Sequence, residues 1–85
     1  MSDLKKRFEA AAQAVKKLDE DPGNAAKLEI YALYKQGSEG DVAGRRPGFT
    51  DMVGRAKYDA WAKVKGMTRE AAMQKYVDLV KSLGA

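Results

Sequence analysis

The chain has 85 residues, of which 45% are hydrophobic and 33% are charged, so it has room for one small core and one domain, residues 1–85. It contains no cysteine and no histidine, which excludes a disulfide framework, a thiol nucleophile and the commonest metal ligand. Its formal net charge of +4 favours an anionic partner such as a nucleic acid, a membrane surface or a phosphorylated small molecule.

Hydrophobic periodicity predicts a first helix over residues 2–18 and a second helix over residues 22–36. The apolar stripe of the first helix comprises Leu4, Phe8, Ala11, Ala12, Val15 and Leu18. Asp21 followed by Pro22 is typical of a helix start, with Asp as the cap and Pro in the first helical position. We expect Gly37 to end the second helix.

Residues 37–48 contain four glycines and a proline, which disfavours regular structure there. A connection of this length is unusual in a small domain and is often functional or a crossover. It is long enough to carry the chain back along a bundle, so the flanking helices need not be antiparallel neighbours.

Two further helices are predicted after this loop. The third spans residues 49–64, with Thr50 as its cap and a buried side that comprises Met52, Ala56, Ala60 and either Trp61 or Val64. Thr68 caps the fourth, whose apolar stripe comprises Ala72, Met73, Tyr76, Val77, Val80 and Leu83. Strand patterns are absent, so the sequence predicts an all-α four-helix bundle.

The compartment follows from two negative features of the sequence. No apolar run approaches the ~18–20 residues needed to cross a bilayer. The basic N-terminal residues are not followed by the apolar region of a secretory signal. We therefore expect a soluble, cytoplasmic protein with no stable membrane insertion.

Tyr31, Tyr34 and Lys35 fall within one sector of the second helix, beside the sector that faces the core. In one interpretation they are partly buried core tyrosines and a solvated lysine. In the other, the rings stack on a nucleobase, while phenol hydroxyls and lysines hold a phosphate. Three residues on the other helices, each next to an apolar stripe, can complete such a site: Lys16, Lys57 and Tyr76.

Catalysis and metal binding have little support. The carboxylates Asp19, Glu20 and Asp21 cluster at a turn between helices, where solvated acids are common. The serines have no histidine to activate them, and no loop of alternating acids is present for a metal ion. We expect no enzymatic activity, no metal and no cofactor.

Several segments together resemble the acyl-CoA-binding proteins. They are Tyr31-Ala32-Leu33-Tyr34-Lys35-Gln36, Gly40-Asp41, Arg46-Pro47-Gly48, Ala56-Lys57-Tyr58-Asp59-Ala60-Trp61, Lys65-Gly66, and Ala72-Met73 with Tyr76. The resemblance extends through nearly the whole chain. It implies an up-down-down-up bundle in which the 37–48 loop is the crossover, and a non-catalytic carrier of medium- and long-chain acyl-CoA thioesters.

The resemblance also implies residue roles. Tyr31, Lys35 and Lys57 would hold the 3′-phosphate of the CoA head group, with help from Lys16. Around the adenine, Tyr34 would pack on the ring, Ala12 would border it, and Tyr76 would close the site. The acyl chain would be flanked by Lys27, Leu28 and Val53.

Three positions depart from the family pattern. Val53 and Arg55 stand where a lysine is frequent, and Tyr58 replaces a frequent tryptophan. The change at Val53 reduces polar cover over the thioester region and bears on chain-length preference.

Two other classes of function remain open from the residues themselves. A basic helical module for nucleic acid or nucleotides would use Arg45 and Arg46 with the 5–7 face, and its affinity would fall steeply with salt. A purely structural bundle would bind no small ligand. The resemblance favours a monomeric acyl-CoA binder over both.

Overall fold

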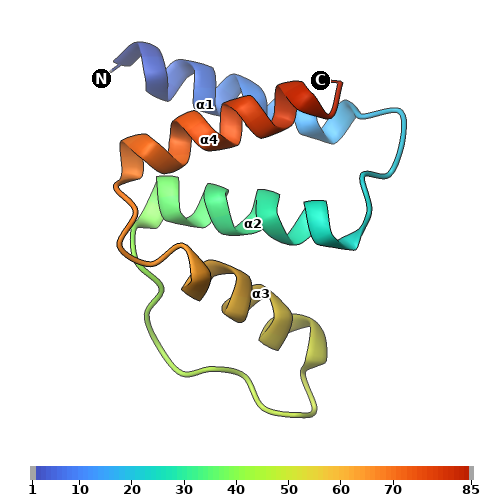
Figure 1. Cartoon of the computed structure of the whole chain (residues 1–85), viewed down its shortest axis with the longest axis vertical. Coiled ribbons are helices and arrows are strands. Elements are labelled where there is room, and N and C mark those ends of the chain that lie inside the picture. Colours follow the sequence, from blue (N-terminus) through green and yellow to red (C-terminus); the bar gives the residue numbers. More distant parts are fainter. Residues whose placement is uncertain (1, 85) are drawn as a thin grey trace.

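The computed structural model describes residues 2–84. Within them the chain forms four α-helices and one short 3-10 helix, namely α1 (Ser2–Ala14), η1 (Val15–Lys17), α2 (Asn24–Glu39), α3 (Met52–Lys63) and α4 (Arg69–Ser82). The chain runs out along α1, returns along α2, repeats that direction in α3 and reverses in α4 (Figure 1). The predicted all-α bundle with up-down-down-up order is therefore confirmed.

The central helix of the bundle is α2, which packs against α4 on one side and α3 on the other, while α1 packs against α4. The core lies among α1, α2 and α4. It consists of Phe8, Ala11, Leu33, Tyr76, Val77 and Val80, each at most 8% exposed. The apolar stripes predicted for the first and fourth helices thus meet on one side of α2.

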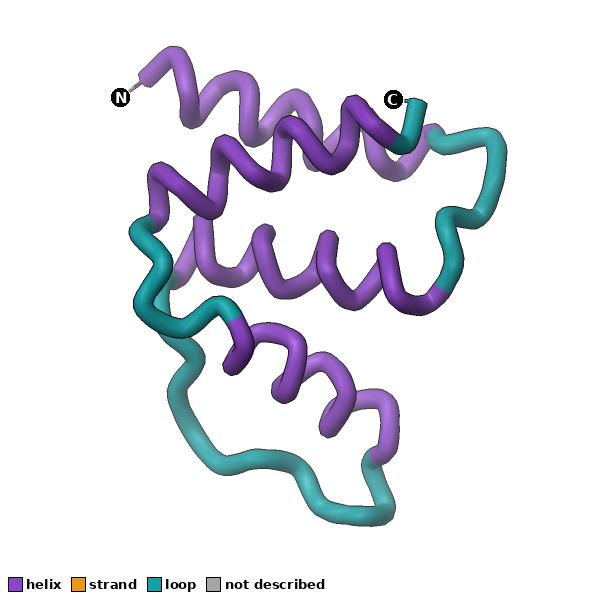
Figure 2. The backbone as a smooth tube through the Cα atoms, in the orientation of Figure 1, coloured by secondary structure: helices purple, strands orange, loops and turns teal. Residues whose placement is uncertain are grey.

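A crossover loop, residues 40–51, connects the end of α2 with the start of α3. It passes around the outer side of α3 before entering that helix (Figure 2). This path allows α2 and α3 to run in the same direction, as the length of the glycine-rich segment predicted. Within residues 2–84, none of the helices has the length and apolar character that crossing a bilayer requires.

The prediction that Gly37 ends the second helix is wrong. Gly37 lies inside α2 and is buried, and a Cβ atom there would lie 3.1 Å from both Met73 Cγ and Phe8 Cζ. Its missing side chain allows α1 and α4 to approach α2 closely. Gly40, with φ of 88°, is the C-cap residue instead, because glycine adopts positive φ without steric cost.

The start of α2 also differs from the prediction. The helix begins at Asn24 after Gly23, so Pro22 precedes the first helical position. Asp21 still organises this turn, because its carboxylate accepts hydrogen bonds from Gly23 N at 2.8 Å and from Lys27 Nζ at 2.7 Å.

The third helix begins later than expected. Asp51, rather than Thr50, is its N-cap and accepts a hydrogen bond from Gly54 N at 3.0 Å. Met52, predicted to be buried, is 69% exposed. The expected cap of the fourth helix is correct, since Thr68 Oγ1 accepts from Ala71 N at 3.1 Å.

Candidate functional site

Two lysines lie over aromatic rings where α2 faces α3. Lys57 Nζ of α3 is 5.5 Å from the ring centroid of Tyr31, and Lys35 Nζ of α2 is 5.3 Å from that of Trp61. Each pair joins the two helices, because a cation is attracted to the electron-rich face of an aromatic ring. The structure thus brings together Tyr31, Lys35 and Lys57, the residues expected to hold a phosphate.

Lys35 is additionally paired with Glu39, one turn later on α2. The hydrogen bond to Glu39 raises the pKa of Lys35, against the smaller opposing effect of desolvation. The ammonium group therefore stays charged at neutral pH. Its side chain is 27% exposed and that of Glu39 is 54% exposed, so an incoming anion competes with a carboxylate that water already screens.

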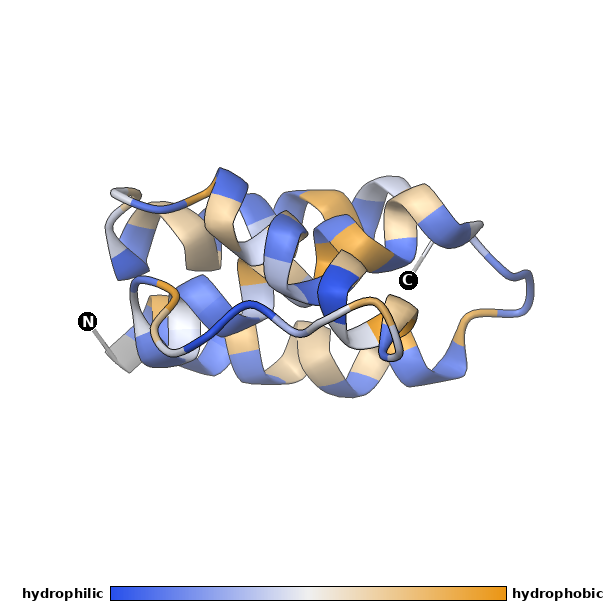
Figure 3. Ribbon diagram, turned by 90° about the horizontal axis from the view of Figure 1, so that it is seen from below, coloured by the Kyte–Doolittle hydropathy of each residue, from blue (hydrophilic) through white to orange (hydrophobic). Residues whose placement is uncertain are grey.

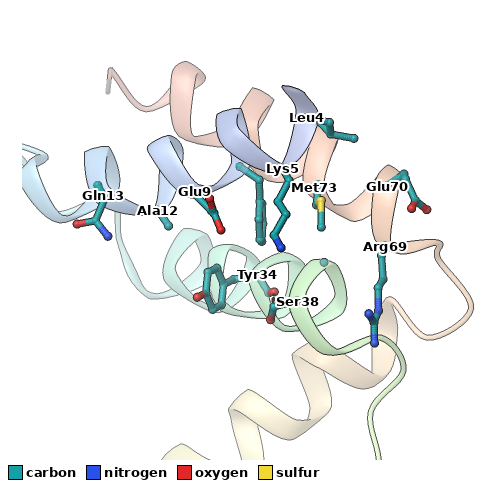
Figure 4. A pocket seen from close by; sticks show the side chains of 12 residues that line it. Leu4, Lys5, Glu9, Ala12, Gln13, Tyr34, Ser38, Arg69, Glu70 and Met73 are labelled. Carbon is teal, nitrogen blue, oxygen red and sulfur yellow. Dashed lines mark hydrogen bonds between the residues drawn. The ribbon is translucent and has the colours of Figure 1, made fainter. Parts of the chain in front are cut away.

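Beside this cluster, a groove of about 480 Å³ separates α1 from α2. Figure 4 shows Ala12 and Lys5 of α1 facing Tyr34 and Ser38 of α2 across it. Its remaining lining residues are Leu4, Phe8, Glu9, Gln13, Gly37, Arg69, Glu70 and Met73. Ala12 and Tyr34, two residues expected around an adenine ring, both line this groove.

The wall of this groove rests on three aromatic rings. Tyr34, 41% exposed, stacks on Phe8 with centroids 5.4 Å apart and an interplanar angle of 20°. Tyr76 lies beneath both rings, with centroids 5.1 Å from Phe8 and 5.8 Å from Tyr34, and is only 2% exposed. Burial raises the pKa of the Tyr76 phenol. Tyr76 therefore supports the groove from below and fixes the position of the ring that a ligand meets.

A polar network missed by the sequence analysis fixes the orientation of Trp61. Gln36 is fully buried; its Nε2 donates to Asp41 Oδ1 and to Met67 O, both at 2.8 Å. Trp61 Nε1 donates to Gln36 Oε1 at 3.1 Å and to Gly40 O at 2.9 Å. The sequence held one sign of this network, because the indole N–H of a partly buried tryptophan such as Trp61 requires a hydrogen-bond acceptor.

The residues expected around an acyl chain do not share one groove. Lys27 is paired with Asp21 and lines a groove of about 410 Å³ near the start of α2. Leu28 lines another groove, of about 620 Å³, between α2 and α3. Val53 is 67% exposed at the start of α3. Lys16 is exposed on η1 and lines none of these grooves.

Two of the positions that depart from the family pattern contact residues of the crossover loop. The Tyr58 hydroxyl donates to Gly44 O at 3.1 Å and so ties α3 to the crossover loop. The guanidinium carbon of Arg55 lies 4.7 Å from the ring centroid of Phe49.

Comparisons with known proteins agree on one family. The family description "Acyl CoA binding protein" matches residues 5–80. The acyl-CoA-binding protein homolog of Drosophila melanogaster is 44% identical over 82 residues, which cover 96% of this chain and 95% of that protein. The crystal structure of Oryza sativa acyl-CoA-binding protein 2 superimposes with a TM-score of 0.93 at 40% identity, covering 96% of this chain and 89% of that one.

Some relatives are much longer. Enoyl-CoA delta isomerase 2 of Homo sapiens is 50% identical over 78 residues, which cover 92% of this chain but 20% of that protein. The same protein of Rattus norvegicus gives the same identity and coverage. The chain thus spans about a fifth of the length of these two relatives.

Proposed function

Because the chain belongs to the acyl-CoA-binding protein family, we propose that it binds medium- and long-chain acyl-CoA thioesters. It carries them as a monomer in the cytoplasm and catalyses no reaction on them. The arrangement that carries this proposal is a pair of lysines, Lys35 and Lys57, beside the groove that Ala12 and Tyr34 line.

The lysines match the charge of the head group. A phosphate monoester carries roughly −1.5 to −2 charge at neutral pH, and each hydrogen bond to a charged group is worth about 1.5–3 kcal/mol. Lys35 and Lys57 are held near Tyr31 and Trp61 before a ligand arrives, which lowers the ordering cost of binding. Tyr31 offers its hydroxyl to the same phosphate, and Lys16 approaches from η1.

The adenine occupies the groove beside this phosphate site. Tyr34 presents the exposed face of a ring that Phe8 and Tyr76 hold from behind, and base–aromatic stacking is worth about 1–3 kcal/mol. Ala12 leaves room for the base because its side chain is a single methyl group. The acyl chain then leaves toward the groove between α2 and α3 that Leu28 lines, whereas Lys27 and Val53 lie outside that groove.

The acyl chain supplies a second, separable part of the affinity. Each buried methylene contributes about 0.8 kcal/mol, so roughly eight of them add about 6 kcal/mol before ordering costs are subtracted. Calorimetric titration with hexadecanoyl-CoA and with free CoA tests this. We expect the ester to bind orders of magnitude more tightly.

Equal affinities for the two ligands would contradict the carrier function. A parallel titration with a short single-stranded oligonucleotide distinguishes the alternative class. Oligonucleotide binding that falls steeply with salt, without binding of the ester, would favour a nucleic-acid module.

A further inference from the structure

The last residue of α2 carries a carboxylate that the helix itself does not favour. Glu39 ends α2, and the partial negative charge at the C-terminal end of a helix disfavours a further negative charge there. Glu39 also follows Lys35 by four residues, and a base before an acid is the less favourable order for such a pair. Helix stability therefore does not explain an acid at this position.

The carboxylate of Glu39 has one partner. Within residues 2–84, the hydrogen bonds and ion pairs of this side chain are confined to Lys35 Nζ. The bond from Arg69 Nη2 to Glu39, at 3.1 Å, is accepted by the backbone carbonyl oxygen and leaves the carboxylate unoccupied. The role of the Glu39 side chain is therefore tied to Lys35.

Lys35 has a neighbour one turn away in each direction along α2. Tyr31 lies four residues before it and Glu39 four residues after it, so all three share one helix face. Lys57 Nζ, 5.5 Å from the ring centroid of Tyr31, marks the side on which the phosphate is proposed to bind. Long side chains in helices incline toward the preceding turn, so Lys35 can turn from Glu39 toward Tyr31.

The pair between Lys35 and Glu39 lies where water reaches it. The two side chains are 27% and 54% exposed, and in Figure 3 hydrophilic colour interrupts the hydrophobic colour along the helices. Ion pairs that water screens are weak, whereas a phosphate with a charge near −2 offers Lys35 a stronger partner. The phosphate can therefore displace the carboxylate, at some cost to its affinity.

We propose that Glu39 is an internal competitor of the 3′-phosphate: it pairs with Lys35 in the free protein, is displaced when the phosphate binds, and pairs with Lys35 again as the ligand leaves. Glu39 is a positioning residue, because it acts through Lys35. The inference rests on the proposed acyl-CoA site. Competition of this kind lowers the affinity for esters that carry the 3′-phosphate and speeds their release, which suits a carrier that must give up its ligand.

Calorimetry and stopped-flow measurements of ligand release, made on the wild-type protein and on Glu39→Gln, test the proposal. The ligands are hexadecanoyl-CoA and the same ester lacking the 3′-phosphate. We expect Glu39→Gln to bind the complete ester about five- to tenfold more tightly, mainly through slower release, since both the competing pair and the repulsion of the phosphate are removed. The affinity for the ester without the phosphate should stay the same.

Two further variants separate the local contact from general charge. Asp78→Asn removes the same charge from an exposed position on α4 and should leave both affinities unchanged. When Lys35→Met is already present, Glu39→Gln should lose most of its effect, because the cation for which the carboxylate competes is gone.

The proposal and the acyl-CoA site fail in different ways. Unchanged or weaker binding of the complete ester by Glu39→Gln, an equal gain for both esters, or a full gain in the presence of Lys35→Met would overturn the competition and leave the acyl-CoA site standing. Wild-type protein that binds hexadecanoyl-CoA no better than free CoA would overturn the proposed function and this inference together.

Discussion

The two sides of α2 are stabilised in different ways. On the side of α1 and α4, apolar side chains such as Phe8, Val77 and Val80 are almost fully buried. On the other side, α3 contains no fully buried residue. It is attached by directional contacts instead, including the hydrogen bonds of Trp61 to Gln36 and Gly40.

The proposed site therefore draws on two regions that we expect to differ in local stability. The groove between α1 and α2 rests on the packed core, whereas Lys57 and Trp61 belong to the hydrogen-bonded helix. Regions with few buried apolar contacts open at lower free energy than the core. We therefore expect acyl-CoA to stabilise α3 more than α4, since the head group in the proposed site would contact both sides of α2.

The largest effect is expected from a core substitution. Phe8→Ala removes a side chain that is 4% exposed, and such a truncation costs about 3–5 kcal/mol of unfolding free energy. Chemical denaturation measures the loss. Met52→Ala on α3, 69% exposed in the native protein, is the matched control and should change stability by less than about 0.5 kcal/mol. Similar losses in the two variants would contradict the contrast between the two sides.

A smaller and more local effect is expected at Gln36. Gln36→Leu removes the partner of Asp41, Met67 O and Trp61 at once, and a buried polar group left unsatisfied costs about 1–3 kcal/mol. Hydrogen exchange should show the loss of protection mainly in residues 40–66. Gln74→Leu, at a position that bonds only locally to Asp78 on α4, is the control. A uniform loss along the chain would show that α3 unfolds together with the core.

The smallest effect is expected on the stability of the fold at low pH, through Asp41. Hydrogen bonds from Gly66 N and from Gln36 lower the pKa of Asp41 in the folded protein. Its contribution to stability is therefore complete above the unfolded pKa of about 3.9 and is lost as the pH falls through the lower folded value. Asp41→Asn should make stability less dependent on pH below about 4. If the stability of Asp41→Asn fell with acid as steeply as that of the wild-type protein, the folded-state pKa of Asp41 would not be lowered by these hydrogen bonds.

The helices could be predicted from the sequence because their apolar stripes follow helical spacing, as in the stripe from Ala72 to Val80. The residues at which the helices end could not all be predicted, because some of them depend on tertiary contacts. Gly37 is typical of a helix end, yet it lies inside α2, where a glycine is needed because Phe8 and Met73 leave little room for a Cβ atom. The packing that requires a glycine at Gly37 comes from residues far along the chain, and spacing alone does not reveal it.

The candidate site was predictable to a similar degree. Tyr31 and Lys35 share a helix face by spacing alone, but their approach to Lys57 and Trp61 depends on the path of the crossover loop. The burial of Tyr76 follows from its place in the apolar stripe of the fourth helix, but its contact with Tyr34 and the network around Gln36 arise from three-dimensional packing and have no periodic signal. Tyr76 therefore supports the proposed site from within the core.

The central claim is that Lys57 and its neighbours hold the 3′-phosphate of the head group. Calorimetry on the wild-type protein and on Lys57→Ala, each titrated with hexadecanoyl-CoA and with the same ester lacking the 3′-phosphate, tests it most directly. We expect Lys57→Ala to weaken binding of the complete ester about 10- to 100-fold and to have little effect on the ester without the phosphate. Equal losses for both ligands would show that Lys57 does not contact this phosphate and would contradict the proposed site.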